Sequence, residues 1–195
     1  MPLALRSVLS LLAVSCALHP SRVLAQAELP IAGLSTVFAD DLSQWDVYDY
    51  DDNRAGELRL RYPGMAGQLG DITQWTFRFD DVDGSIRPKI TGRNDVWEVR
   101  VGDDVAVVRT LFPGQLDQWT IQSGSDRLVY VVRDYRLLEY WGVRGPGGPG
   151  DFAVYTTFEG DWRDWTVQDA TTAPVGAAAQ LAMIWLPVYM RLVAR

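Results

Sequence analysis

The last part of the chain is the feature that most constrains its fold. The residues from Val175 to Met190 are apolar apart from Gln180. At about 100° per residue this segment shows no polar stripe, and a helix that is apolar all round is buried in protein or in a membrane. Its first half consists mainly of Gly and Ala, so the helix is thin there and suits a confined space.

We predict that this helix spans residues 174–193. Pro174 suits the first turn of a helix. Pro187 removes one backbone donor and is expected to end or kink the helix after Leu186. The N-terminus is expected to be capped by a nearby polar side chain, for which the candidates are Asp169, Thr171 and Thr172.

The N-terminal segment has the pattern of a secretory signal. Arg6 precedes an apolar stretch from Val8 to Leu18, and both Ala25 and Ala27 end a small-x-small cleavage pattern. We therefore predict a signal peptide over residues 1–25, an irregular leader over residues 26–33 and a secreted or periplasmic domain. The alternative is a lipoprotein, because Ala13-Val14-Ser15-Cys16 resembles a lipobox whose cysteine would be acylated.

Removal of the signal would change the chemistry that is open to the domain. Cys16 and His19 are the only cysteine and histidine in the chain. The mature domain would then have no disulfide, no Cys- or His-based nucleophile and few strong ligands for zinc. It would keep 16 basic and 25 acidic side chains, a net charge of −9. This charge opposes binding to nucleic acid and electrostatic adsorption to anionic lipid.

From Leu34 onward the chain consists of short segments of period two, which is typical of strands and hairpins. Trp97, Val99 and Val101, for example, alternate with polar residues. Twelve strands are predicted, near residues 35–39, 45–50, 56–62, 74–80, 85–91, 95–101, 105–112, 118–123, 127–133, 137–144, 151–158 and 162–168.

Tryptophans mark an internal repeat in this region. Trp75, Trp97, Trp119 and Trp141 are 22 residues apart, which is enough for two strands and two turns. The repeat is therefore interpreted as a β-hairpin laid down in series, with the tryptophans as core residues. A long series of hairpins exposes its edges unless it closes. Since each strand has one apolar face, closure into an up-and-down barrel is favoured.

The barrel and the helix explain each other. A barrel of about eight strands fills with its own side chains, whereas a larger one leaves space for a helix roughly 10–12 Å across. We therefore predict a mainly β domain over residues 34–195, a closed antiparallel barrel of about twelve strands around a buried C-terminal helix. A C-terminal membrane anchor is the alternative, although the apolar run is shorter than the ~20 residues that a span needs.

Three stretches add a resemblance to a known group. Residues 45–53, residues 75–84 and residues 165–169 with the apolar tail resemble the tubby C-terminal-like superfamily, which includes tubby proteins, phospholipid scramblases and LURP-one-related proteins. The resemblance implies a closed twelve-strand barrel around a hydrophobic C-terminal helix. It says less about the partner. Tubby domains bind phosphoinositide headgroups through a basic patch, and scramblase-like members are cytoplasmic. This chain is acidic and carries an export signal.

Two acidic clusters are candidate sites. Asp49, Asp51 and Asn53 have the spacing of the first half of a calcium loop, but Arg54 replaces the expected Gly and Leu60 the bidentate Glu. They are a candidate calcium site, although a turn is the favoured interpretation because hairpins need such residues anyway. The second cluster surrounds two tryptophans and could supply the paired carboxylates of a glycosidase, although a charged turn is favoured; its members are Glu159, Asp161 and Asp164.

These patterns favour a non-enzymatic binding module of the cell envelope whose partner is a lipid or another protein. No catalytic residue and no cofactor is assigned, apart from weak calcium binding. Two alternatives remain open: a hydrolase that uses paired carboxylates, and a lipocalin-like carrier of small molecules with an open bore. The ligand and the oligomeric state do not follow from the sequence.

Overall fold

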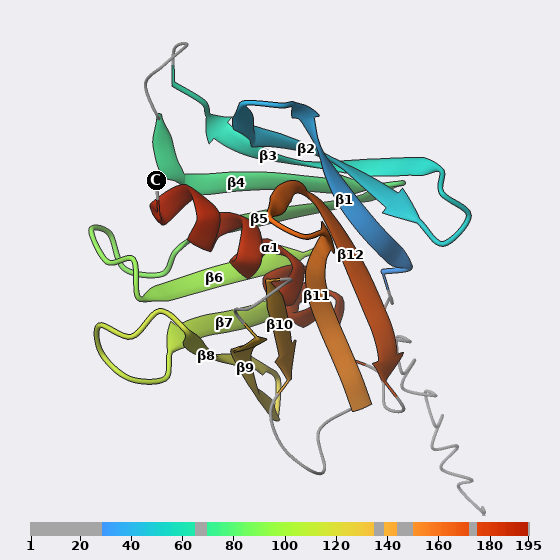
Figure 1. The fold of residues 1–195 in the computed structure, drawn as a ribbon. Helices are drawn as coiled ribbons and strands as arrows, with labels where there is room; N and C mark the ends of the chain where they lie inside the picture. The colour runs from blue at the N-terminus through green and yellow to red at the C-terminus, as the bar shows by residue number, and fades with distance from the viewer. Residues whose placement is uncertain (1–28, 65–69, 135–138, 144–149, 172–174, 195) are drawn as a thin grey trace, which may run out of the picture.

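The computed structural model describes residues 29–64, 70–134, 139–143, 150–171 and 175–194, with the backbone alone at 132–134 and 150–151. The expected signal peptide lies outside these residues. The described chain forms twelve strands and one helix (Figure 1). They are β1 (Ile31–Phe38), β2 (Asp41–Asp49), β3 (Arg54–Tyr62), β4 (Asp71–Phe79), β5 (Val82–Pro88), β6 (Val96–Val101), β7 (Asp104–Thr110), β8 (Gln118–Ser123), β9 (Asp126–Asp134), β10 (Tyr140–Val143), β11 (Gly150–Phe158), β12 (Asp161–Thr171) and α1 (Ala177–Val193).

The strands form a closed antiparallel barrel in which each pairs with its neighbours in the sequence. β1 closes it: Leu34 lies opposite Val47 of β2 on one side and Trp165 of β12 on the other. The predicted fold class is thereby confirmed, and each predicted strand overlaps an observed one. The expected irregular leader is wrong in part, since Ile31 is already a buried residue of β1. Closure explains this, because β1 must be long enough to pair along both of its edges.

Up-and-down topology gives the barrel two different ends. The helix-start mouth is formed by the turns that join β2 to β3, β4 to β5, β6 to β7 and β8 to β9, and α1 begins there. The helix-end mouth is formed by the β1–β2 turn, the β3–β4, β5–β6 and β7–β8 loops and the β11–β12 turn, and α1 ends there. Figure 1 shows the C-terminus on the side where the β5–β6 and β7–β8 loops project.

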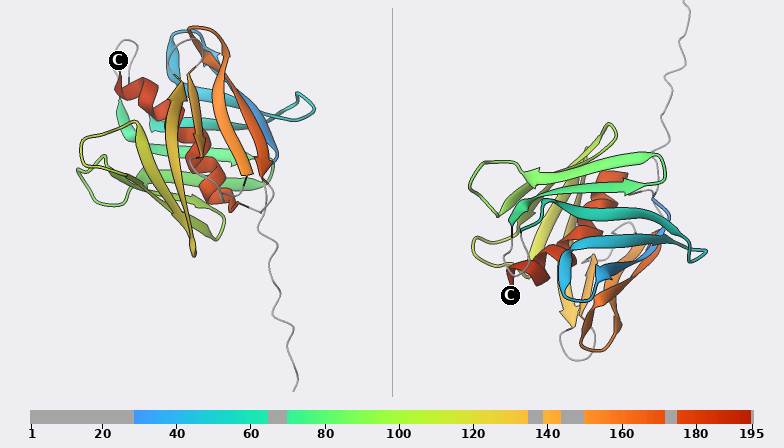
Figure 2. Two further views of the ribbon diagram at one scale, coloured as in Figure 1. Left: turned by 60° about the horizontal axis from the view of Figure 1, so that its bottom comes forward. Right: turned by 90° about the horizontal axis from the view of Figure 1, so that it is seen from above.

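α1 runs through the barrel (Figure 2), and every residue from Ala177 to Tyr189 is buried. The ring of Trp185 packs against those of Trp97 and Tyr189 with centroids 4.8 Å apart in each case. Gly84 of β5 lets the helix approach closely, since a Cβ there would lie 3.1 Å from Leu181 Cδ2. An apolar helix and an apolar barrel wall thus remove each other's surface from water, which is the main favourable term in folding.

Gln180, the polar residue in the apolar run, is buried, and both polar atoms of its side chain have a hydrogen-bond partner. Its Oε1 accepts the backbone N–H of Leu29 at 2.9 Å, and its Nε2 donates to Asp169 Oδ2 at 3.0 Å. Buried polar groups need such partners to offset their loss of hydration. Gln180 therefore ties the segment before β1 and the end of β12 to the helix.

The helix N-terminus is capped from the barrel and not from its own flank. Asp104 at the start of β7 accepts the backbone N–H of Ala178 at 2.9 Å and the hydroxyl of Ser123 at 3.0 Å. The expected cap by Asp169 or Thr171 is wrong: Asp169 accepts from Thr171 and Gln180 instead. The third candidate, Thr172, lies outside the described residues. The sequence could not show this cap because 74 residues separate Asp104 from Ala178.

Of the two effects expected at Pro187, an end or a kink of the helix after Leu186, the end does not occur. α1 continues through Pro187 to Val193, and Arg191 in its last turn forms an ion pair with Glu139, which precedes β10. A proline inside a helix removes one N–H bond and strains the preceding turn. Here packing on all sides of Pro187 holds the helix together, since its neighbours Leu186 and Val188 are fully buried.

Replacement of Asp104 by Ala should lower the free energy of unfolding by about 1–2 kcal/mol, because the helix N-terminus loses its cap and the negative charge near its dipole. Chemical denaturation measures this loss. The matched control is Asp103→Ala, which removes a carboxylate from the exposed neighbouring position. Equal losses in the two variants would contradict the capping role.

Candidate binding site

Buried tryptophans fasten the connections of the helix-end mouth to the core. Each even-numbered strand carries one such residue: Trp45, Trp75, Trp97, Trp119, Trp141 and Trp165. Five of them donate the indole N–H to the backbone carbonyl three residues earlier, at 2.8 to 3.0 Å. The sixth, Trp141, donates to Glu139 Oε1 at 3.0 Å. The acceptors all lie at the helix-end mouth, so its loops are anchored at regular intervals around the barrel.

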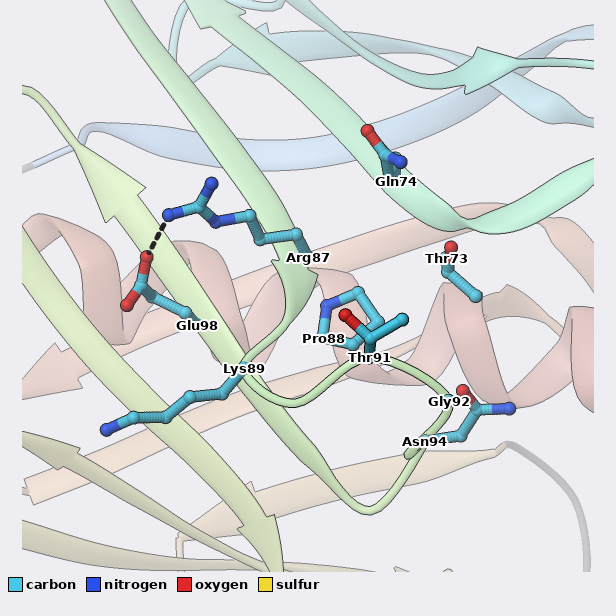
Figure 3. A pocket seen from close by; sticks show the side chains of 9 residues that line it. All are labelled: Thr73, Gln74, Arg87, Pro88, Lys89, Thr91, Gly92, Asn94 and Glu98. Atoms are coloured by element: carbon cyan, nitrogen blue, oxygen red, sulfur yellow. Dashed lines mark hydrogen bonds and ion pairs between the residues drawn. The ribbon is translucent and has the colours of Figure 1, made fainter.

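A pocket of about 440 Å³ opens on the outer face of the barrel beside this mouth (Figure 3). Its walls come from β4, β5, β6 and the β5–β6 loop. Arg87, Lys89 and Glu98 lie along one side of it in Figure 3, and neutral polar residues lie along the other. The complete lining is Thr73, Gln74, Arg87, Pro88, Lys89, Thr91, Gly92, Asn94 and Glu98.

The pocket carries an excess of positive charge in an acidic chain. Glu98 Oε1 accepts from Arg87 at 2.9 Å and from Arg100 at 3.0 Å. The hydrogen bond from Arg87 holds the pKa of Glu98 below its usual value, so Glu98 stays ionised between two arginines. The Arg87 side chain is 60% exposed. Within the described part of the chain the Lys89 ammonium makes no ion pair. Donors of Arg87 and Lys89 are therefore available to an anionic group.

Two of the tryptophan anchors shape this pocket. Trp75 bonds the carbonyl of Ile72 at 3.0 Å, next to Thr73, and Trp97 bonds that of Asn94 at 2.9 Å. The β5–β6 loop is closed further by the bond from Lys89 N to the Val96 carbonyl at 2.9 Å. The walls are thus held by the same indoles that set the repeat. The 22-residue spacing of these tryptophans is visible in the sequence. The spacing alone does not show that the outer ends of the hairpins enclose a pocket.

The predicted metal site lies at the opposite, helix-start mouth. Asp49 Oδ1 accepts the backbone N–H groups of Asp51 and Asn53, each at 2.9 Å. The bond from Asn53 lowers the pKa of Asp49. This carboxylate closes the β2–β3 turn, in which Asp52 has a φ of 59°. Among the described residues, no group of three or more His, Cys, Asp or Glu is arranged to hold a metal ion. Calcium binding therefore stays a prediction without structural support.

Two of the three carboxylates beside Trp162 and Trp165, those of Asp161 and Asp164, accept hydrogen bonds. Asp161 accepts two bonds from the Arg163 guanidinium, at 2.8 and 2.6 Å, which lower its pKa to about 2. Asp164 accepts the Ser35 hydroxyl at 2.5 Å across the closing strand pair. An acid that is ionised down to such low pH holds no proton to donate near neutrality. The geometry favours the charged-turn interpretation of this cluster.

Trp97→Phe should loosen the β5–β6 loop, because the phenyl ring fills most of the same space but cannot donate to the Asn94 carbonyl. Hydrogen exchange read by mass spectrometry should show faster exchange in residues 89–95. Trp165→Phe removes the equivalent anchor of the β11–β12 hairpin and serves as the control. If both variants accelerate residues 89–95 equally, the effect is global destabilisation and the local anchoring role is wrong.

The low pKa of Asp161 should make the stability of the folded protein depend on pH. Its pKa in the folded chain, about 2, is lower than the usual value of about 4 in an unfolded chain. The contribution of its pair with Arg163 is therefore fully present above about pH 4 and is lost as the pH falls through about 2. Wild type should be more stable than Asp161→Asn at neutral pH, and the two should converge in acid denaturation series. Glu159→Gln, which removes a charge from the same hairpin end, should show a smaller difference.

In the described residues, no helix is both long and apolar enough to span a membrane. Comparison of the chain with models of protein families, with curated proteins and with solved structures found no match. The resemblance to the tubby C-terminal-like superfamily is not tested by these comparisons and stays a prediction.

Proposed function

We propose that this protein is an exported, non-catalytic binding module of the cell envelope that holds an anionic polar group of its partner in the pocket beside the helix-end mouth. The observation that carries the proposal is the combination of a filled barrel with a cationic pocket on its outer face. An anionic ligand needs space together with available hydrogen-bond donors, and the pocket offers both.

The filled interior argues against a carrier. In a lipocalin-like protein the ligand occupies the bore. Here the bore contains α1, whose residues from Ala177 to Tyr189 are all buried. A ligand could enter only by expelling the helix, which would expose a long apolar segment to water. The outside of the barrel is therefore the more favourable place for recognition.

The electrostatics of the carboxylates argue against an acid–base enzyme. A general acid or base works best when its pKa lies near the working pH. The pKa of Glu98 in the pocket is lowered by Arg87, and that of Asp161 is about 2. Both groups are stably ionised near neutrality. Their arrangement supports ion pairing and ligand binding better than proton transfer.

The residues of the pocket favour a small anion that also carries hydroxyl groups. Arg87 supplies a planar set of donors and Lys89 a point charge, which are the usual partners of carboxylates and phosphates. Opposite them, Thr73, Thr91 and Asn94 offer neutral donors and acceptors. A sugar acid, a hydroxy acid or a phosphate-bearing group fits this pattern. The resemblance to tubby proteins would be consistent with an anionic ligand, but this pocket contains a single lysine.

Glucuronate, citrate and inorganic phosphate are suitable probes for this pocket. At least one of them should bind the purified protein in calorimetric titration, and Arg87→Gln or Lys89→Gln should weaken that binding roughly tenfold, the effect of losing one charged hydrogen bond. Arg78→Gln is the matched control: its side chain is 63% exposed and pairs with Asp83 on β5, toward the other mouth. Absence of binding by all three probes, or equal loss in the control, would overturn the assignment of the pocket.

A further inference from the structure

Exposed apolar side chains gather at one end of the barrel. Among the described residues, eight large hydrophobic side chains are exposed. Four aromatic members lie at the helix-end mouth: Phe38, Tyr62, Phe112 and Phe158. Three aliphatic members lie there too, namely Ile90, Leu116 and Val193. Single exposed hydrophobic residues are normal on protein surfaces, but their accumulation at one end needs an explanation.

These seven residues, which we call the apolar rim, are carried by separate elements. Phe38 ends β1, Tyr62 ends β3, Phe158 ends β11 and Val193 ends α1. Ile90 belongs to the β5–β6 loop, and Phe112 and Leu116 belong to the β7–β8 loop. The rim is therefore a set of apolar tips around the mouth, and not one continuous flat patch.

The structure holds these tips in position. The carbonyl of Leu116 accepts the indole N–H of Trp119 at 2.8 Å, and the N–H of Gln115 bonds the carbonyl of Phe112 at 3.2 Å. Phe38 and Phe158 sit beside two-residue turns on neighbouring hairpins, since β1 pairs with β12. These contacts fix the backbone that carries the tips, so little backbone entropy is lost when the rim binds.

The opposite mouth has the reverse character. Its turns carry aspartates at positions 49, 51, 52, 80, 81 and 103. Tyr50 is the one large exposed hydrophobic residue of that end in the described chain. At the helix-end mouth, basic residues stand among the apolar tips, and the Arg61 guanidinium lies 5.5 Å from the centroid of the Tyr62 ring. The helix-end mouth carries carboxylates too, including Asp40 and Glu159 in the turns beside Phe38 and Phe158, but several of its carboxylates are paired with arginines.

We propose that the apolar rim docks the protein on a lipid surface, with the barrel axis directed away from the membrane. This inference goes beyond the proposed function: the rim meets the pocket at Ile90 in the β5–β6 loop, but Phe38 and Phe158 lie on other hairpins and can be tested separately. Aromatic side chains favour the boundary between headgroups and acyl chains. Docking in this orientation keeps the aspartates of the helix-start mouth as far as the barrel allows from lipid phosphates.

A lipid surface fits the rim better than a protein does. A protein partner buries continuous, closely complementary surface with a packed apolar centre. Separate tips on seven positions would need a matching pocket for each of them. A fluid interface accepts isolated apolar tips without complementary pockets, and the charged outer faces of the strands, such as Arg78, Arg87 and Arg100, then remain in water.

Flotation with vesicles tests the docking, using protein recovered from the periplasm with its N-terminus identified by mass spectrometry. The wild type should float with vesicles of phosphatidylcholine alone and no better when phosphatidylglycerol is added, because apolar contact drives the docking and the acidic chain is not attracted to anionic lipid. The double variant Phe38→Ser, Phe158→Ser should lower the partition coefficient by roughly tenfold or more. Phe112→Ser alone should have a smaller effect in the same direction.

Tyr50→Ser is the matched control, since Tyr50 is 57% exposed against 58% for Phe38 and 61% for Phe158 but lies at the other mouth. It should float as the wild type does. All variants should keep the wild-type unfolding midpoint, because the changed side chains are exposed. Equal flotation of the double variant, flotation only with phosphatidylglycerol or no flotation of the wild type would overturn the proposal. So would a dimer, seen by light scattering, that the double variant dissociates without any vesicle binding.

Arg87→Gln separates this inference from the proposed function. It should weaken anion binding in the pocket roughly tenfold and leave flotation unchanged, whereas the double rim variant should lower flotation and leave anion binding unchanged. Loss of both activities in either variant would show that the two surfaces are not separate and would overturn the inference as stated.

Discussion

The mutual burial of α1 and the inner wall of the barrel is the interaction on which the rest of the structure depends. A barrel of twelve strands is too wide to fill with its own side chains, and an apolar helix cannot remain in water. The thin first half, built from Ala177, Ala178 and Ala179, and the bulky Trp185 further along fit one continuous interior. Because each partner removes the other's exposed apolar surface, neither is expected to be stable alone.

Polar contacts fix the position of the helix within this apolar interior. Hydrophobic contact is not directional and would allow α1 to slide or rotate. Asp104 and Gln180 at the beginning of the helix and the pair of Arg191 with Glu139 near its end each join α1 to a different part of the wall. Buried hydrogen bonds of this kind specify one arrangement because the alternatives leave charged or polar groups unsatisfied. They explain why a nearly uniform apolar segment has a single register.

The architecture was predictable from sequence because it rests on periodicity, whereas the sites rest on long-range placement. Alternation along the strands and the absence of a polar stripe in the helix predicted the barrel and its core. The helix does not end at Pro187, one of the two effects expected there, because packing on all sides overrides local propensity. Asp104 caps the helix from a distant part of the chain, 74 residues before Ala178. No local sequence pattern could therefore predict this cap. Asp49 illustrates the converse: the same spacing serves a calcium loop or a turn, and the observed hydrogen bonds are those of the turn.

The different character of the two mouths follows from the repeat itself. Within the 22-residue units, one connection is a two-residue turn whose first position has positive φ, as at Asp80, Gly102 and Gly124. Such turns require Gly, Asp or Asn, so the helix-start mouth becomes polar and acidic. The other connections, residues 89–95 and 111–117, are longer and are held by tryptophan indoles, which leaves their remaining side chains unconstrained by turn geometry. Within these repeat units, the longer loops therefore give more freedom for exposed apolar and pocket-forming residues, and they lie at the mouth where the helix ends.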